Sequence, residues 1–246
     1  MAESDSGTSK AGSGKRCSGG GSNSAEALIK RALVYICGSF ILAMGIAFTV
    51  KADLGLSPVN TLPFVVSRVS GADFGLMVTL FYSSFVLVQI AVLGKEFQLK
   101  NLLQIIVSVI FGNFVSLCEN ILLHIEPGGY PVRLFFLAAG IFMISLGILL
   151  ILIADIVPQP PEGLLIAVQK KTGWKFSNIK IGFDCTMLLL SVIIAMLFGA
   201  GLPGIREGTL ISALTIGKTI ALLSKLVQKP VARFCYGSDN ARNSLE

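Results

Sequence analysis

The chain has 246 residues, of which 53% are hydrophobic and only 14% are charged, and its mean hydropathy is +0.78. Because soluble domains carry about 25% charged residues, this composition excludes an ordinary soluble enzyme or binding domain. The windows 134–154 and 187–205 contain no charged residue at all. A helix needs about 20 apolar residues to cross a bilayer, so we expect an all-α, polytopic membrane helix bundle.

The net charge of +6 lies mainly in the two tails and in a few loops. This distribution is typical of the positive-inside bias, so we expect a lipid bilayer, and no nucleic acid, as a partner. The five cysteines are scattered without a CxxC pair, and the single histidine, His124, lies in a predicted loop. We therefore expect no metal site, no cofactor and no catalytic residues.

The first half of the chain begins with a tail at residues 1–28 that is rich in Ser and Gly. This tail offers too little apolar surface to fold, so we expect it to be disordered. The membrane domain is expected at 29–228, and its first repeat at about 31–123. Three long apolar segments in this repeat are expected to cross the bilayer: 31–50, 76–93 and 101–123.

The second half follows a turn-rich linker at 126–131. Its repeat is expected at about 134–228. Three further long apolar segments lie in it: 134–153, 176–198 and 208–227. Lys229-Pro230 is expected to end the last helix, because proline disrupts a helix interior, and 229–246 would then form a cytoplasmic tail.

Two polar stretches interrupt this apolar sequence, 52–60 (ADLGLSPVN) and 154–162 (ADIVPQPPE). Each precedes an apolar piece, 59–69 in the first half and 163–168 in the second. The first piece corresponds to roughly 16 Å of helix, against about 30 Å of hydrocarbon. We therefore expect two short helices that are broken or re-entrant.

The two halves match at a constant offset of 102 residues, and the matches fall on breaks and turns. Examples are Gly45 with Gly147, Asp53 with Asp155, Pro58 with Pro160, Gly71 with Gly173, and Phe74 with Phe176. Three spans in each half would give the halves opposite orientations. Interrupted segments at corresponding positions of such an inverted repeat point to the binding site of a transporter.

The alternative is that both short helices cross the bilayer, which would give eight spans. The positive-inside rule does not separate the two topologies, because each leaves four basic residues outside. The shortness of 59–69 favours six spans with two re-entrant helices. Both topologies place the two chain ends in the cytoplasm.

Three motifs resemble a known family: GIAF at 45–48 running into ADLGLSP at 52–58, FDCT at 183–186, and REGTLISA at 206–213. The chain resembles the YczE/YyaS/YitT group of bacterial integral membrane proteins from about Arg31 to Val227. The resemblance implies a multi-pass protein of the bacterial inner membrane. It implies no settled activity, since members of this group are usually described as transporters without a demonstrated substrate.

Seven side chains beside the two breaks are candidate substrate-binding residues: Asp53, Ser57, Asn60, Thr61, Asp155, Gln159 and Glu162. An acid near a membrane must be paired or hydrated, and a half-helix N-terminus favours an anionic group. Plainer roles stay open, since Ser57 can cap the first short helix and both aspartates can lie at helix ends.

Asp184 and Lys218 are candidates for proton or ion coupling, because each lies inside a predicted span. A charge inside a span costs at least ~2.5–3.5 kcal/mol, so we expect the two side chains to meet and to neutralise each other. A purely structural pair, or a lysine that extends to the interface, is the alternative.

These observations favour a secondary transporter or exporter of a small polar molecule, which works by alternating access of two inverted halves. The alternative is an accessory or regulatory membrane protein that does not transport. A membrane enzyme is not expected, because the sequence shows neither a nucleophile–base set nor a metal cluster. A homo-oligomer is compatible with all of these functions.

Overall fold

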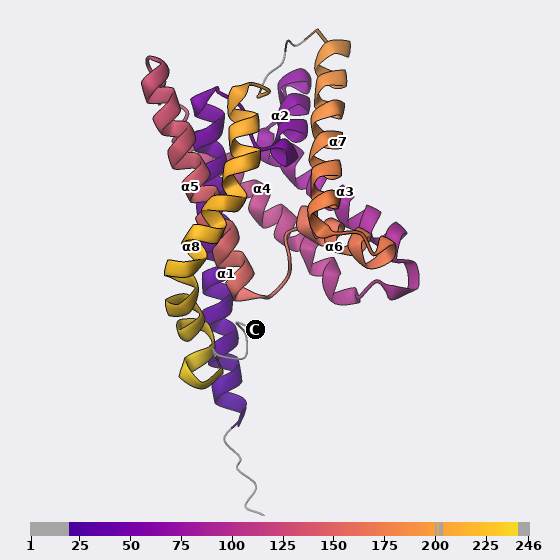
Figure 1. Cartoon of the computed structure of the whole chain (residues 1–246), viewed down its shortest axis with the longest axis vertical. Helices are drawn as coiled ribbons and strands as arrows, with labels where there is room; N and C mark the ends of the chain where they lie inside the picture. The colour runs from indigo at the N-terminus through magenta and orange to yellow at the C-terminus, as the bar shows by residue number, and fades with distance from the viewer. Residues whose placement is uncertain (1–19, 200, 202–203, 241–246) are drawn as a thin grey trace, which may run out of the picture.

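The structure, a computed structural model, describes residues 20–199, 201 and 204–240. These residues form eight α-helices and two short 3₁₀ helices, with no strand among them (Figure 1). The elements in chain order are α1 (Gly20–Ala52), α2 (Pro58–Ser70), α3 (Phe74–Leu93), η1 (Gly94–Glu96), η2 (Leu99–Leu102), α4 (Leu103–Ile121), α5 (Tyr130–Ala154), α6 (Pro160–Thr172), α7 (Phe176–Leu197) and α8 (Glu207–Asn240).

Six helical stretches in the described chain are long and apolar enough to cross a membrane. They are Glu26–Ala52, Phe74–Glu96, Leu99–Ile121, Tyr130–Ala154, Phe176–Leu197 and Glu207–Cys235. This confirms the predicted all-α membrane protein with six long apolar helices. The remaining helices, α2 and α6, have 13 residues each and are therefore only about 20 Å long.

The helix boundaries of the two halves coincide at the offset of 102 residues. The coinciding pairs are the ends at Ala52 and Ala154, the starts at Pro58 and Pro160, and the starts at Phe74 and Phe176. The C-caps of the short helices, Gly71 and Gly173, also correspond, and both adopt left-handed backbone with φ of 70°. Each half thus uses the same local signals to break and restart the chain.

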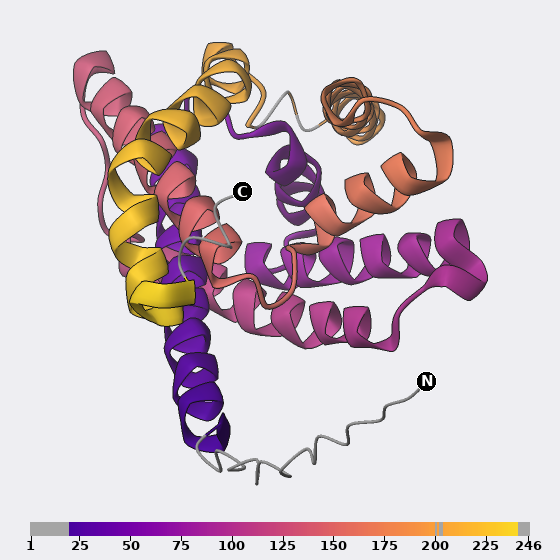
Figure 2. The ribbon, with the colours of Figure 1, turned by 60° about the horizontal axis from the view of Figure 1, so that its bottom comes forward.

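The long helices α1 and α5 pack against each other in antiparallel fashion and, with α8, form one side of the molecule (Figures 1 and 2). Their close approach depends on glycines in equivalent positions. A Cβ on Gly45 would lie 2.9 Å from the carbonyl oxygen of Gly140, and a Cβ on Gly147 would lie 2.7 Å from that of Gly38. Small residues let helix backbones approach closely where lipid provides no hydrophobic driving force.

The short helices are exchanged between the halves. Helix α2 packs on α7 of the second half, and α6 packs on α3 of the first half. Within the first half, α3 and α4 also pack closely against each other where Gly75 meets Gly112. In the second half Ser177 stands at the position of Gly75, and α7 and α8 lie apart (Figure 2).

Two predicted boundaries are wrong. Helix α1 already starts at Gly20, inside the expected disordered tail, and an ion pair of 2.6 Å between Glu26 and Lys30, one turn apart, supports this extension. Helix α8 passes through Pro230 and continues to Asn240. Residues 1–19 and 241–246 of the expected tails lie outside the described residues.

Packing explains why α8 continues. Ala232 lies in a buried apolar cluster with Leu149 and Ile153 of α5. The ammonium group of Lys30 lies 5.8 Å from the ring centre of Phe234. These contacts offset the backbone hydrogen bond that a proline removes from a helix.

Candidate functional site

Asp53 lies at the end of α1, where the first break begins. Its backbone is left-handed with φ of 49°, a conformation that aspartate tolerates better than most residues. Its Oδ2 atom lies 3.1 Å from Arg133 of α5 and 3.2 Å from Arg206, just before α8. The side chain of Asp53 is 60% exposed, so this is an ion-pair cluster at one end of the bundle.

The loop that follows Asp53 is fixed to the start of α8 by backbone hydrogen bonds. The amide of Gly208 donates to the carbonyl of Leu54 at 2.7 Å, and the amide of Leu56 donates to Gly204 at 3.0 Å. Gly55 has φ of 124°, and a Cβ there would lie 2.5 Å from Thr209 Oγ1. Only glycine fits this crossing, which ties the first break to the second half.

Asp155 repeats the geometry of Asp53 at the other end of the α1–α5 pair. Its φ is 45°, and its carboxylate lies 3.7 Å from Arg31 of α1, which also donates to the carbonyls of Ala154 and Asp155. Arg31 and Arg133 are 102 residues apart, as are Asp155 and Asp53. Each of these two helices therefore carries an arginine that pairs with the aspartate directly after the end of the other.

The first turn of α2 carries a buried polar network. Tyr82 of α3 donates to Asn60 Oδ1 at 3.1 Å, and Asn60 Nδ2 donates to Ser57 Oγ at 3.0 Å. Thr61 donates from its hydroxyl to the carbonyl of Ser57 at 3.0 Å. Ser57 makes no side-chain cap on α2, so the predicted capping is wrong: its hydroxyl accepts from Asn60 instead.

The first turn of α6 lies at the equivalent place in the second half, and its chemistry differs. Glu162 corresponds to Asn60, and Asp184 of α7 corresponds to Tyr82. Glu162 interacts electrostatically with Lys180 and Asp184, and Lys180 Nζ lies 2.8 Å from Asp184 Oδ1. A neutral hydrogen-bonded pair in one half is thus replaced by two acids and one lysine in the other.

Four buried side-chain atoms on α1 and at the start of α6 have no hydrogen-bond partner within the described chain. They are both side-chain amide atoms of Gln159, the hydroxyl of Tyr35 and the hydroxyl of Ser39. Tyr35 and Tyr82 both interact electrostatically with Glu162. Buried polar groups normally have partners, so these unpaired atoms indicate a place for a ligand, an ion or water.

The predicted meeting of Asp184 and Lys218 is wrong. Asp184 pairs with Lys180, four residues earlier on the same helix. Lys218 is exposed on α8 and forms no ion pair within the described part of the chain, because α8 lies away from α7. Of the predicted residues, the structure brings together Glu162 and Asp184 around α6, and Ser57, Asn60 and Thr61 around α2.

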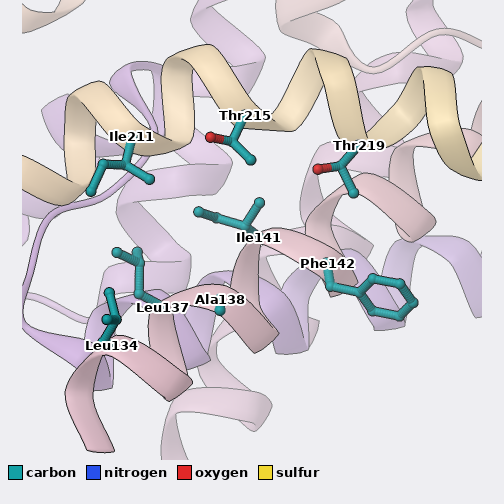
Figure 3. A pocket seen from close by; sticks show the side chains of 8 residues that line it. All are labelled: Leu134, Leu137, Ala138, Ile141, Phe142, Ile211, Thr215 and Thr219. Carbon is teal, nitrogen blue, oxygen red and sulfur yellow. The ribbon is translucent and has the colours of Figure 1, made fainter. Parts of the chain in front are cut away.

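Two hollows lie elsewhere, and none of the predicted site residues lines them. An apolar groove of about 320 Å³ runs between α5 and α8, where Ile141 faces Thr215 and Thr219 (Figure 3). A polar pocket of about 250 Å³ lies between α3, α4 and α6. Sequence reasoning did not single out the residues of this pocket.

The comparisons with known proteins agree with this architecture. A family described as "Family of unknown function (DUF6198)" matches residues 29–225. The chain belongs to this family. It is also similar to the uncharacterized membrane protein YczE of Bacillus subtilis (strain 168), with 24% identity over 196 residues, which cover 78% of this chain and 84% of YczE. The resemblance found in the motifs is thereby confirmed, and this DUF6198 member is a multi-pass membrane protein homologous to a bacterial one. No solved structure matches the chain.

Proposed function

We propose that this DUF6198 member is a secondary transporter or exporter of a small polar molecule in the bacterial cell membrane. Its halves are inverted repeats, both chain ends are cytoplasmic, and α2 and α6 are re-entrant helices that enter from opposite sides. The antiparallel packing of α1 and α5, the helix boundaries repeated at 102 residues, and the shortness of α2 and α6 support this topology.

The observation that carries the proposal is the acid pair at the first turn of α6. Lys180 forms an ion pair with Asp184 at 2.8 Å, and Glu162 adds a second carboxylate whose charge is influenced by both groups. Ionisable groups inside a membrane protein are costly, and they mark paths for ions, protons or substrates. Glu162 and Asp184 would take up and release the coupling proton or cation, while Gln159, Tyr35 and Ser39 would bind the substrate.

The ion pairs at the two ends of the α1–α5 pair fit the same mechanism. One end is held together by the ion pairs of Asp53 with Arg133 and Arg206. The opposite end is held together by the ion pair of Asp155 with Arg31. In alternating access, one end opens while the other stays closed. Each cluster would then break in one of the two conformations.

A transport assay tests the proposal. Purified protein is first screened against a metabolite panel by thermal stability, and stabilising compounds are then tested for uptake into proteoliposomes under a pH gradient. We expect E162Q and D184N to abolish the response of uptake to the gradient, while E126Q, in the exposed loop before α5, leaves it unchanged. A gradient response equal in wild type and E162Q would refute the role of the acid pair. Absence of any uptake, together with stable association with another membrane protein, would favour the accessory function.

A further inference from the structure

The polar pocket between α3, α4 and α6 is lined by neither residue of the acid pair, although Gly163 of the pocket directly follows Glu162. Its rim carries Glu96, Lys100 and Lys170, and its floor is formed by Gln89, Gln104 and Gly163. The volume of about 250 Å³ is below the roughly 300–1,000 Å³ of sites for drug-sized ligands. An occupant of this pocket is therefore a small molecule or a single chemical group.

The floor contains a hydrogen-bond donor without an acceptor. Gln89 Nε2 donates to Gln104 Oε1 at 2.8 Å and to the carbonyl of Pro160 at 3.1 Å, which fixes the orientation of both amides. Gln104 Nε2 then has no partner in the described chain, although Gln104 is fully buried. A Cβ on Gly163 would lie 2.9 Å from this nitrogen, so the donor lies where α6 lacks a side chain.

The rim contains a positive charge without an acid partner. Lys170 pairs with Glu96 at 3.0 Å, whereas Lys100 forms no ion pair among the described residues. Helix α4 continues directly from η2, which starts beside the pocket at Leu99 without a side-chain cap, and the N-terminal end of a helix carries a partial positive charge. Lys100, the helix start and Gln104 Nε2 thus offer donors and positive potential to one small space.

We propose that this pocket binds a small oxyanion, a carboxylate or phosphate group, which accepts hydrogen bonds from Lys100 at the rim and from Gln104 Nε2 at the floor. A cation would meet the uncompensated lysine, and an apolar group would leave the floor donor unsatisfied. A free anion and the headgroup of an anionic phospholipid share this chemistry. The site uses none of the residues of the acid pair, so it does not depend on the transport proposal.

Calorimetric titration of the purified full chain in neutral detergent, with sodium phosphate and with sodium succinate at constant ionic strength, tests the site. Lys95 provides a matched control, because it lies in η1 just before the pocket and does not line it. We expect K100M to weaken binding by about tenfold or more, as for loss of a charge-assisted hydrogen bond, and K95M to leave it unchanged. Q104E keeps the acceptor for Gln89 and replaces the free donor by a negative charge, so it should abolish binding.

Native mass spectrometry separates the two sources of the anion. Retention of phosphatidylglycerol over phosphatidylcholine by the wild type, lost in K100M and Q104E, together with no binding of the free anions, assigns the site to a lipid headgroup. Binding of phosphate or succinate without lipid preference assigns it to a soluble anion. If Q104E lowers the melting temperature, G163A serves instead, since its methyl group crowds the floor without changing charge. Equal effects of K95M and K100M, or no anion binding and no lipid preference, would overturn the proposal.

Discussion

Replacing Gly45 by alanine tests whether the α1–α5 crossing depends on close backbone contact. The new Cβ would lie 2.7 Å from the backbone nitrogen of Ile144 and 2.9 Å from the carbonyl oxygen of Gly140. Both atoms belong to the backbone of α5, so no side chain can rotate away. Because ordinary contacts begin at 3.4 Å, the helices must separate by roughly 0.7 Å at this point.

Such overpacking destabilises a well-packed core by about 1–3 kcal/mol. The higher helix propensity of alanine offsets up to about 1 kcal/mol of that, so a reference glycine is needed. Gly182 on α7 provides it, because a Cβ there would meet nothing within 4 Å. The difference in unfolding free energy between G45A and G182A should therefore be about 1–3 kcal/mol.

The assay is unfolding of purified protein by sodium dodecyl sulfate, followed by circular dichroism in mixed micelles. G147A should match G45A, because Gly147 lies at the equivalent position against Gly38 and Leu42. The double variant G45A/G140A should be less destabilised than the sum of its single variants, since both substitutions open the same crossing. If G45A were as stable as G182A, the close-contact explanation would be refuted.

Three further predictions follow from local geometry. Replacing Asp53 by alanine should destabilise the protein by about 1–2 kcal/mol, because alanine is strained in left-handed backbone. D53G should recover the stability lost to this strain in thermal unfolding, although it also lacks the exposed ion pairs. Replacing Gln89 by leucine leaves the acceptors on Gln104 and Pro160 without a donor and should cost about 1–3 kcal/mol; the double variant Q89L/Q104L should lose less than the sum of the single variants. Replacing Pro230 by alanine should slow hydrogen exchange in the last turns of α8, because the missing backbone hydrogen bond is restored, and unchanged exchange would contradict that account.

The presence of the two short helices could be predicted because their signals are local, although α6 runs over Pro160–Thr172 and is longer than the expected piece 163–168. Proline sets the start of α2 and α6, and glycine in left-handed backbone ends both. The end of α8 could not be read in this way. Pro230 predicts a stop, and the contact of Ala232 with α5, which depends on distant residues, overrides it.

The polar and charged contacts also divide into those that sequence spacing could predict and those that depend on the packing of distant residues. Asp184 forms its ion pair with Lys180, four residues earlier on the same helix, so it does not need the distant Lys218 as a partner. Arg31 and Arg133 were within reach of sequence reasoning, because they obey the same offset of 102 as the aspartates that they contact. The partnerless atoms of Tyr35 and Ser39 were not, since only the packing of α1 against other elements buries them.

The exchange of short helices between the halves means that neither half is a complete structural unit. A fragment that ended in the loop before α5 would contain α2 without α7, and would leave uncovered the face of α2 that packs on α7. The complementary fragment would contain α6 without α3, and the carbonyl of Pro160 would lose its donor Gln89. Two such fragments should therefore be degraded when made alone and should accumulate only when both are made in the same cell.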